Sequence, residues 1–195
     1  MRNMKNQGKL IVSAVVIVVF MVAGFFIILK NKSNSEPTKQ EKATLEIRSF
    51  MNDDSLKIQY ANESKFAYDE NIDEDIYISE FDQFEVNSKT GEILQFGPKP
   101  SVVGGKQKAY DYSNKYTEAE LEKMAKDFIT SHNPKIKLNE LIANGGNKEE
   151  TNYFFRWEDR TRRVDGAYPF IEVGFTNGGS ILSYVNALDI DKNNN

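Results

Sequence analysis

The chain has 195 residues, of which 39% are hydrophobic and 28% are charged, so it is long enough for one globular domain or two small ones. It contains no cysteine, which excludes disulfides, lipid attachment through a thiol and catalysis by a cysteine nucleophile. The net charge is −4, and removing the three positive charges of residues 1–9 leaves −7 for the rest, so nucleic acid is not an expected partner.

An uncharged apolar run of 20 residues, Leu10–Leu29, follows a short basic tail, residues 1–9. In a helix, with a rise of about 1.5 Å per residue, this run spans roughly 30 Å, the thickness of a bilayer core. A cleaved signal peptide is the alternative, but no small-residue cleavage site follows the run. We therefore predict an uncleaved transmembrane helix over residues 10–29.

Basic residues lie on both sides of this run in similar numbers, so the positive-inside rule does not decide the orientation of the helix. A short basic tail before a long apolar run resembles an uncleaved export signal, which favours a cytoplasmic tail and a domain on the extracytoplasmic side of the cell membrane. The alternative is a domain that faces the cytoplasm. Residues 30–42 are polar and predict a flexible spacer, and residues 190–195 predict a disordered tail.

The first segment after the spacer, residues 43–100, predicts a helix followed by strands. Leu45, Ile47 and Ser49 alternate as in a strand, but the apolar residues of this stretch match those of a later helix at a constant offset of 78, which favours a helix. The matched residues are Ala43, Ile47, Phe50 and Met51 with Leu121, Ala125, Phe128 and Ile129. Strands are then expected at 56–64 and on both sides of the glycine turn in EVNSKTGEILQF, Glu85–Phe96.

An acidic run within this segment, DENIDEDIYISE, follows the calcium loop of an EF-hand at most positions. Asp69, Asn71, Asp73, Asp75 and Glu80 occupy the first, third, fifth, seventh and twelfth places of the loop. The sixth place, however, is Glu74 where the turn needs glycine, and a strand pattern follows in place of an exiting helix. We predict no metal site here and keep a calcium sensor as an alternative to an acidic loop that enters a strand.

The second segment, residues 101–189, predicts a capped helix followed by antiparallel strands. Thr117 and Glu120 have the spacing of a capping box, an apolar stripe follows at helical spacing, and Asn133 and Pro134 end the helix. Strands are expected at NYFFRWED, PFIEVGF and SILSYVNAL, with the glycine turn TNGG between the last two. The inward-facing residues should be Tyr153, Phe155 and Trp157, then Ile171, Val173 and Phe175, then Leu182, Tyr184 and Leu188.

Six residues of the first segment, GEILQF from Gly91, nearly recur as GSILSY from Gly179, 88 positions later. A helix followed by strands that meet at a turn of this type resembles the PepSY domain family (peptidase propeptide and YpeB). The resemblance covers residues 42 to 189, although the second hairpin is one residue longer and has no charged residue after its glycine. It implies a non-catalytic, cystatin-like fold that binds or restrains bacterial peptidases and cell-wall enzymes, and the tandem arrangement resembles membrane-anchored cell-wall regulators of Gram-positive bacteria.

Catalytic chemistry finds little support in the residue types. His132 is the only histidine, so a serine triad has one candidate base and a zinc site of the HExxH kind cannot form. This histidine falls at the end of the predicted helix, where a cation is favoured by the helix dipole. We predict no catalytic residue, no cofactor and no enzyme activity.

Four of the six arginines lie near the only tryptophan, in RWEDRTRR. Arginine and tryptophan are enriched at binding hot spots, so we predict a protein-binding surface formed by Arg156, Arg160, Arg162 and Arg163. The alternative places Trp157 in the core and pairs the arginines with Glu158, Asp159 and Asp165 in water.

The sequence therefore predicts an α+β protein: an N-terminal transmembrane helix followed by two PepSY-like, cystatin-like units, each a helix packed on an antiparallel sheet. The expected function is that of a membrane-anchored extracytoplasmic module that regulates or inhibits a peptidase or cell-wall enzyme. The alternatives are a sensor of calcium or a small ligand at the membrane surface, and a structural subunit of a membrane machine.

Overall fold

The structure is a computed structural model that describes residues 36–100, 105–149, 151–164 and 166–188. All of its helices and strands belong to one compact unit, Lys39–Asn195. The elements are α2 (Lys39–Met51), β1 (Gln59–Phe66), β2 (Asp69–Ile78), β3 (Asp82–Asn87), β4 (Ile93–Pro98), α3 (Glu118–His132), the 3₁₀ turn η1 (Leu138–Glu140), β5 (Ile142–Glu149), β6 (Asn152–Glu158), β7 (Phe170–Thr176) and β8 (Ile181–Asn186).

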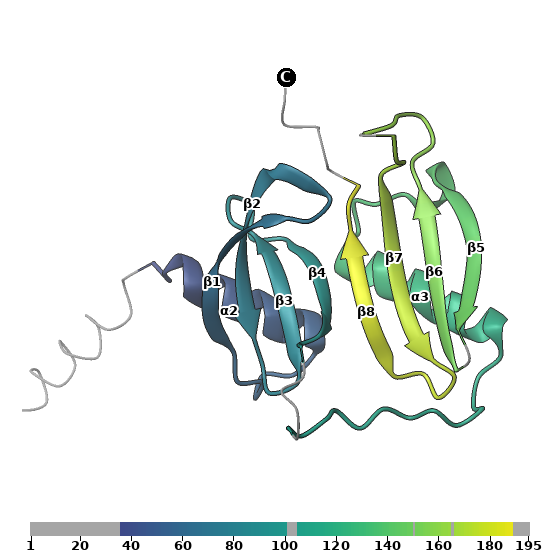
Figure 1. The fold of residues 1–195 in the computed structure, drawn as a ribbon, viewed down its shortest axis with the longest axis horizontal. Coiled ribbons are helices and arrows are strands. Elements are labelled where there is room, and N and C mark those ends of the chain that lie inside the picture. Colours follow the sequence, from purple (N-terminus) through teal and green to yellow (C-terminus); the bar gives the residue numbers. More distant parts are fainter. Residues whose placement is uncertain (1–35, 101–104, 150, 165, 189–195) are drawn as a thin grey trace, which may run out of the picture. The chain divides into compact units, whose positions relative to one another are not determined.

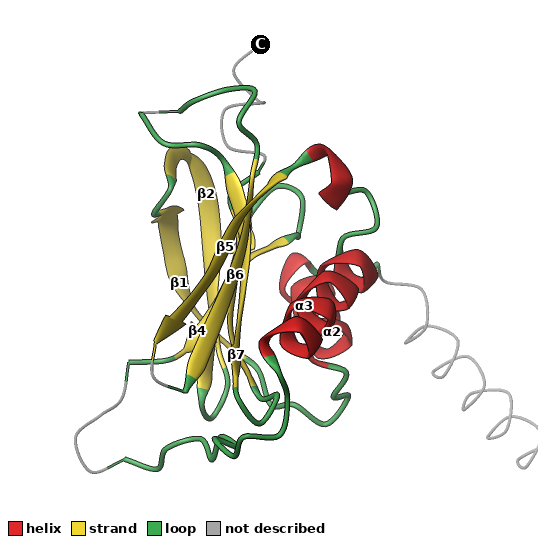
Figure 2. Cartoon of the chain, turned by 90° about the vertical axis from the view of Figure 1, so that its right-hand side faces the viewer, coloured by secondary structure: helices red, strands yellow, loops and turns green. Residues whose placement is uncertain are grey.

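The strands form one eight-stranded sheet in the order β1-β2-β3-β4-β8-β7-β6-β5, and every neighbouring pair is antiparallel (Figure 1). Both α2 and α3 lie against the same face of this sheet (Figure 2). We call this the helix face and the opposite one the open face. Each half of the unit thus runs through a helix and then four strands, and the two halves meet where β4 pairs with β8.

This architecture corrects the predicted fold class. Two units with separate sheets were expected, but β4 and β8 join all eight strands into one sheet, and that prediction is wrong. The predicted transmembrane helix, Leu10–Leu29, lies outside the described residues. None of the helices in the described residues combines the length and the apolar composition that a bilayer crossing requires.

The helices predicted for the segments 43–100 and 101–189 are both present. Helix α2 begins at Lys39, inside the stretch predicted as spacer, and buries Ala43, Ile47 and Phe50. The N-terminus of α3 carries the predicted capping box: the Thr117 hydroxyl accepts from the Glu120 amide, and the Glu120 carboxylate accepts from the Thr117 amide at 2.8 Å. Two orphan amides of the first turn are thereby satisfied, which fixes where the helix starts.

One apolar core fills the space between the helices and the sheet. Tyr153, Phe155 and Trp157 of β6 are 8%, 3% and 3% exposed, as the period of two predicted. Helix α3 contributes Leu121, Ala125 and Ile129, each fully buried. Because side chains from both halves belong to this single cluster, neither half has a core of its own.

The two glycine hairpins that share a sequence also share a backbone conformation. Gly91 has φ 78° and Gly179 has φ 84°, a region in which a side chain costs energy. In both hairpins the register then slips at a leucine, Leu94 between β3 and β4 and Leu182 between β7 and β8. This slip leaves Ile181 rather than Leu182 opposite Phe175. The repeat of 88 positions therefore encodes one turn and one bulge, used twice.

Strand β5 was not predicted. Its sequence, IANGGNKE, has no apolar alternation, and Gly145, with φ 65°, lies in an irregular step of its pairing with β6. The strand is held by backbone hydrogen bonding at the edge of the sheet, so the side-chain pattern gave no signal.

We expect the Phe155→Ala variant to lose about 3 to 5 kcal/mol of unfolding free energy, because a buried ring is replaced by a cavity. Urea denaturation measures this loss. The matched control is Leu45→Ala on α2, whose side chain is 58% exposed and whose truncation should change the stability by less than about 0.5 kcal/mol. Equal effects of the two substitutions would show that Phe155 is not a core residue.

The two turn glycines should differ in their tolerance of alanine. Gly91→Ala should cost about 1 to 2 kcal/mol, which is the cost of placing a side chain on a left-handed backbone. No steric clash adds to this cost, because a Cβ at Gly91 meets nothing within 4 Å. Gly179→Ala should cost more, because its Cβ would lie 2.6 Å from Cε2 of Tyr116. Denaturation midpoints of the two variants provide the comparison, and a smaller loss for Gly179→Ala would contradict it.

Candidate functional site

The connection between β6 and β7, residues 159–169, carries three of the four arginines of the predicted binding surface. Arg156 lies on β6 itself, while Arg160, Arg162 and Arg163 follow in the connection. Trp157, between them in sequence, is 3% exposed and belongs to the core on the helix face. The structure therefore separates the tryptophan from the arginines, as the alternative interpretation required.

Each arginine has a partner within the chain. Arg156 Nε donates to Glu172 Oε2 at 2.8 Å on the open face, and its guanidinium carbon lies 3.9 Å from the Phe170 ring centroid. Arg160 Nε donates to Glu158 Oε2 at 3.0 Å. Arginine stacks well on aromatic faces because its guanidinium is planar and weakly hydrated. These contacts fix both side chains before any partner arrives.

Arg162 and Arg163 organise the connection in different ways. Arg162 is half-buried and donates to Asp159 Oδ2 at 3.1 Å. It also donates to the carbonyl oxygen of Leu188, so it joins the connection to the segment that follows β8. Arg163 is exposed, donates to the Tyr168 hydroxyl at 2.9 Å and stacks on the same ring at 4.6 Å. The four arginines therefore differ in exposure: Arg160 and Arg163 are exposed, whereas Arg156 and Arg162 are half-buried and bonded within the fold.

Asp159 is the acidic centre of this connection. Its carboxylate accepts from the Thr161 hydroxyl, from the Thr161 amide at 3.0 Å and from Arg162. These donors, the Thr161 hydroxyl first, hold the pKa of Asp159 below its ordinary value. The carboxylate is thus charged and accepts three charge-assisted hydrogen bonds, which hold the start of the connection in place.

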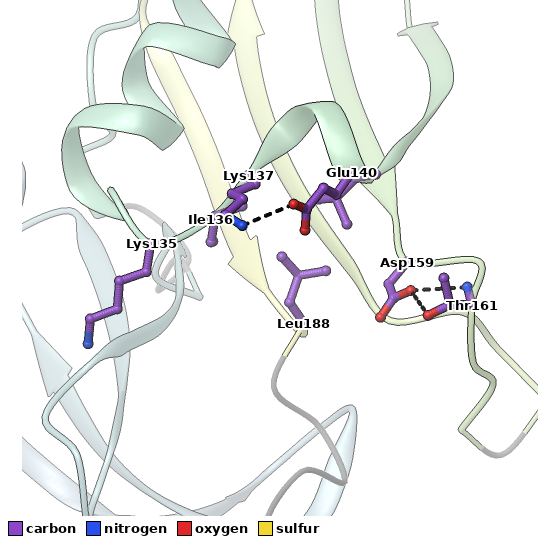
Figure 3. Close-up of a pocket in the computed structure, with 8 residues that line it drawn as sticks. Lys135, Ile136, Lys137, Glu140, Asp159, Thr161 and Leu188 are labelled. Atoms are coloured by element: carbon purple, nitrogen blue, oxygen red, sulfur yellow. Dashed lines mark hydrogen bonds and ion pairs between the residues drawn. The ribbon is translucent and has the colours of Figure 1, made fainter.

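A pocket of about 520 Å³ lies beside this connection (Figure 3). Its walls come from the segment after α3, from the start of the β6–β7 connection and from Leu188, two residues after β8. The lining residues are Lys135, Ile136, Lys137, Glu140, Leu141, Asp159, Thr161 and Leu188. Lys137 pairs with Glu140 at 3.1 Å, so the pocket combines apolar walls with charges that are largely balanced. Such a pocket can take a side chain of a partner protein.

Of the lining residues, the sequence had singled out Asp159 as a partner of the arginines and Leu188 as an inward-facing residue, and it predicted a pocket at neither. The segments that form the pocket lie far apart in the chain, so no local pattern could have identified it. The same holds for a pair of buried carboxyl groups on the open face, Glu74 and Glu85, which are 3% and 9% exposed.

His132 occupies the end of α3, as expected, and joins the two helices. Its Nδ1 lies 2.7 Å from the Phe128 carbonyl oxygen, and its Nε2 lies 2.9 Å from the Phe50 carbonyl oxygen at the end of α2. Both ring nitrogens are therefore engaged by helix carbonyls. The position serves helix capping and leaves neither nitrogen turned toward a substrate.

The acidic run does not adopt the loop conformation that the EF-hand alternative requires. Asp69–Ile78 is strand β2, so successive side chains of the run point to opposite faces instead of surrounding one point. Asp75 pairs with Lys39 at 2.7 Å and Asp73 with Lys65 at 2.6 Å. In the part of the chain that the structure describes, no three side chains of His, Asp or Glu are placed to hold a metal ion.

We expect millimolar calcium to leave the melting temperature of the protein unchanged, because the acidic side chains of β2 cannot converge on one ion. Thermal unfolding of the parent and of Glu80→Gln with calcium or with a chelator measures this. A calcium-dependent rise in the parent that Glu80→Gln abolishes would contradict it.

Comparison with known proteins gives one informative likeness. No family model matches the sequence, and no curated protein matches it. The solved C-terminal domain of YpeB from Bacillus megaterium superposes with a TM-score of 0.54 at 14% identity, over 80% of this chain. This chain spans about 65% of the length of that one. At this identity the likeness concerns the fold alone, and it supports a distant PepSY-like fold.

Proposed function

We propose that the chain is a non-catalytic binding module that regulates or inhibits a peptidase or a cell-wall enzyme. The observation that carries this proposal is the fold likeness to the YpeB C-terminal domain, together with the sequence resemblance to the PepSY family. One feature agrees with it: both ring nitrogens of His132 lie against helix carbonyl oxygens.

The partner is proposed to bind where the exposed arginines and the pocket lie next to each other on the second half. Arg160 and Arg163 both lie over the Tyr168 ring, at 5.8 and 4.6 Å from its centroid. A guanidinium that is already stacked loses little conformational entropy on binding, so it can contribute more to affinity than a free side chain. The adjacent pocket offers apolar surface from Ile136, Leu141 and Leu188 for an anchoring side chain.

We further propose that the module works on the extracytoplasmic side of the cell membrane. This location rests on the sequence alone, through the basic tail and the apolar run Leu10–Leu29. The module could then reach a peptidase or cell-wall enzyme on the extracytoplasmic surface of the cell membrane.

The experiment that tests the proposal is chemical crosslinking in the native cells, followed by mass spectrometry of the captured proteins. The test variant combines Arg160→Ser and Arg163→Ser, because both side chains are exposed; Arg162 is left in place because it holds Asp159 and Leu188. The matched control combines Lys123→Ser and Lys126→Ser on α3, which removes the same charge from another surface. Exposed substitutions of this kind cost within about 0.5 kcal/mol each.

We expect the parent and the lysine control to capture a peptidase or cell-wall enzyme, and the arginine variant to lose it at equal protein level. Equal capture by all three proteins would place the contact elsewhere. Capture of further copies of this chain alone would contradict the proposal and favour a structural subunit of a membrane assembly.

A further inference from the structure

Strands β1 and β2 form a hairpin, Gln59–Ile78, whose tip folds over the open face of the sheet, and we call this hairpin the strap. Phe66 at its tip is 2% exposed and packs in a second apolar cluster, separate from the main core. The other buried members of this cluster are Leu94, Phe170, Val185 and Ala187. In Figure 1 the upper part of β2 bends toward β4 and β8. The tip of the strap therefore covers strands that belong to both halves.

Tyr68 adds a second contact at the tip. Its ring lies 5.3 Å from Phe66 and 5.2 Å from Phe170, both in edge-on geometry. Tyr68 itself is 42% exposed, so the tip is held by one fully buried ring and one peripheral ring. These two rings provide little apolar contact for the tip of the hairpin. Strand β1 is also an edge strand, so it is hydrogen-bonded to a neighbouring strand on one side only.

Two buried carboxyl groups lie at the base of the strap, Glu74 on β2 and Glu85 on β3. Both point to the open face, because their neighbours Asp75, Phe84 and Val86 point to the helix face, where Asp75 meets Lys39 of α2. In the register Glu74 faces Asn87, and Glu85 faces Ile76, so the two glutamates are diagonal neighbours. Glu74 Oε2 is buried and has no hydrogen-bond partner in the described residues.

Among the described residues, no cationic side chain acts on Glu74 or Glu85. The groups that face it are Ser64 on β1, Gln83 on β3, whose amide donates to Glu85 at 3.0 Å, and Gln95 on β4, directly opposite Glu85. Glu85 and Gln95 begin a row of residues that lie opposite one another on successive strands, and the row continues through Val185 and Glu172 to Arg156. Arg156 forms an ion pair with Glu172. It lies four strands from Glu85, a distance of about 19 Å. The single lysine of the strap, Lys65, is paired with Asp73 at 2.6 Å.

Two carboxyl groups in contact, buried and without a cation, cannot both be charged at low cost, so they share one proton. Burial first, then repulsion from Glu85 and a hydrogen bond with it, raises the pKa of Glu74 to about 7. Burial also raises the pKa of Glu85. The proton therefore sits on Glu74, which donates to the Glu85 carboxylate.

We propose that the carboxyl pair is a proton-operated latch: the strap stays closed while Glu74 and Glu85 share a proton, and it is released when both become charged. The closed form binds more protons than an open form in which both groups are hydrated. Its stability is therefore lost as the pH rises from the ordinary value of a glutamate toward and past neutrality. Release uncovers Leu94, Phe170, Val185 and Ala187, an apolar surface that spans both halves.

Hydrogen exchange followed by NMR on the full chain tests this latch. The measured quantity is the protection of the β1 and β2 amides, corrected for the intrinsic pH dependence of exchange, relative to the amides of β7. With Glu74 at an ordinary pKa in the open form, the opening equilibrium should increase about tenfold between pH 6 and pH 8. Glu74→Gln should abolish this increase, because the amide can donate to Glu85 at every pH. Glu70→Gln, at the exposed tip of the same hairpin, should retain it.

Three results would overturn the latch: constant protection of the parent strap from pH 6 to pH 8, an unchanged increase in Glu74→Gln, or a loss of the increase in Glu70→Gln. If Glu74→Gln fails to fold, Glu85→Gln provides the second test, since it removes the repulsion that drives opening. His132 lies on the helix face and is unchanged in all these variants, so it cannot account for a difference between them.

Discussion

The pairing of Phe96 with Tyr184 across β4 and β8 is the contact on which the rest of the structure depends. These residues are 88 positions apart, as are the two turn glycines, so equivalent residues of the two hairpins meet face to face. Phe50 of α2 contacts both rings, at 6.1 and 5.3 Å, and also Phe128 of α3 at 5.2 Å. Meeting of equivalent residues is what a two-fold relation produces at its axis. We call this β4–β8 pairing the seam; it joins the strands of both halves, and Phe50 and Phe128 of the two helices pack beside it.

Because the sheet is continuous across the seam, each of its two faces is shared by both halves of the unit. The helix face is filled by one core, so its residues serve stability. The open face carries the row from Glu85 to Arg156, in which charged groups of both halves lie in one register. The strap crosses this face from the first half to the second, while the arginine connection and its pocket belong to the second half alone. The proposed contact site and the proposed latch therefore lie on different parts of one sheet.

Local signals in the sequence predicted the elements that depend on local physics. The capping box at Thr117 and the glycine turns at Gly91 and Gly179 need only neighbouring residues, and all three are present. Asp69–Ile78 was ambiguous because the calcium ligands of an EF-hand and the residues on one face of a strand share a spacing of two. The joined sheet could not be predicted, since β4 and β8 have the same alternation whether they pair or form separate edges. The pocket and the carboxyl pair depend on register and on distant segments, which no local pattern encodes.

Cooperative unfolding tests the central claim, that the seam makes the two halves one folding unit. Urea unfolding of the full chain, followed by NMR signals of Val86 in β3 and Val173 in β7, reports on the two halves separately. Because both valines belong to one core, the account predicts a single transition with the same midpoint and the same slope for both signals. Two transitions, with one half unfolded while the other retains native signals, would contradict it.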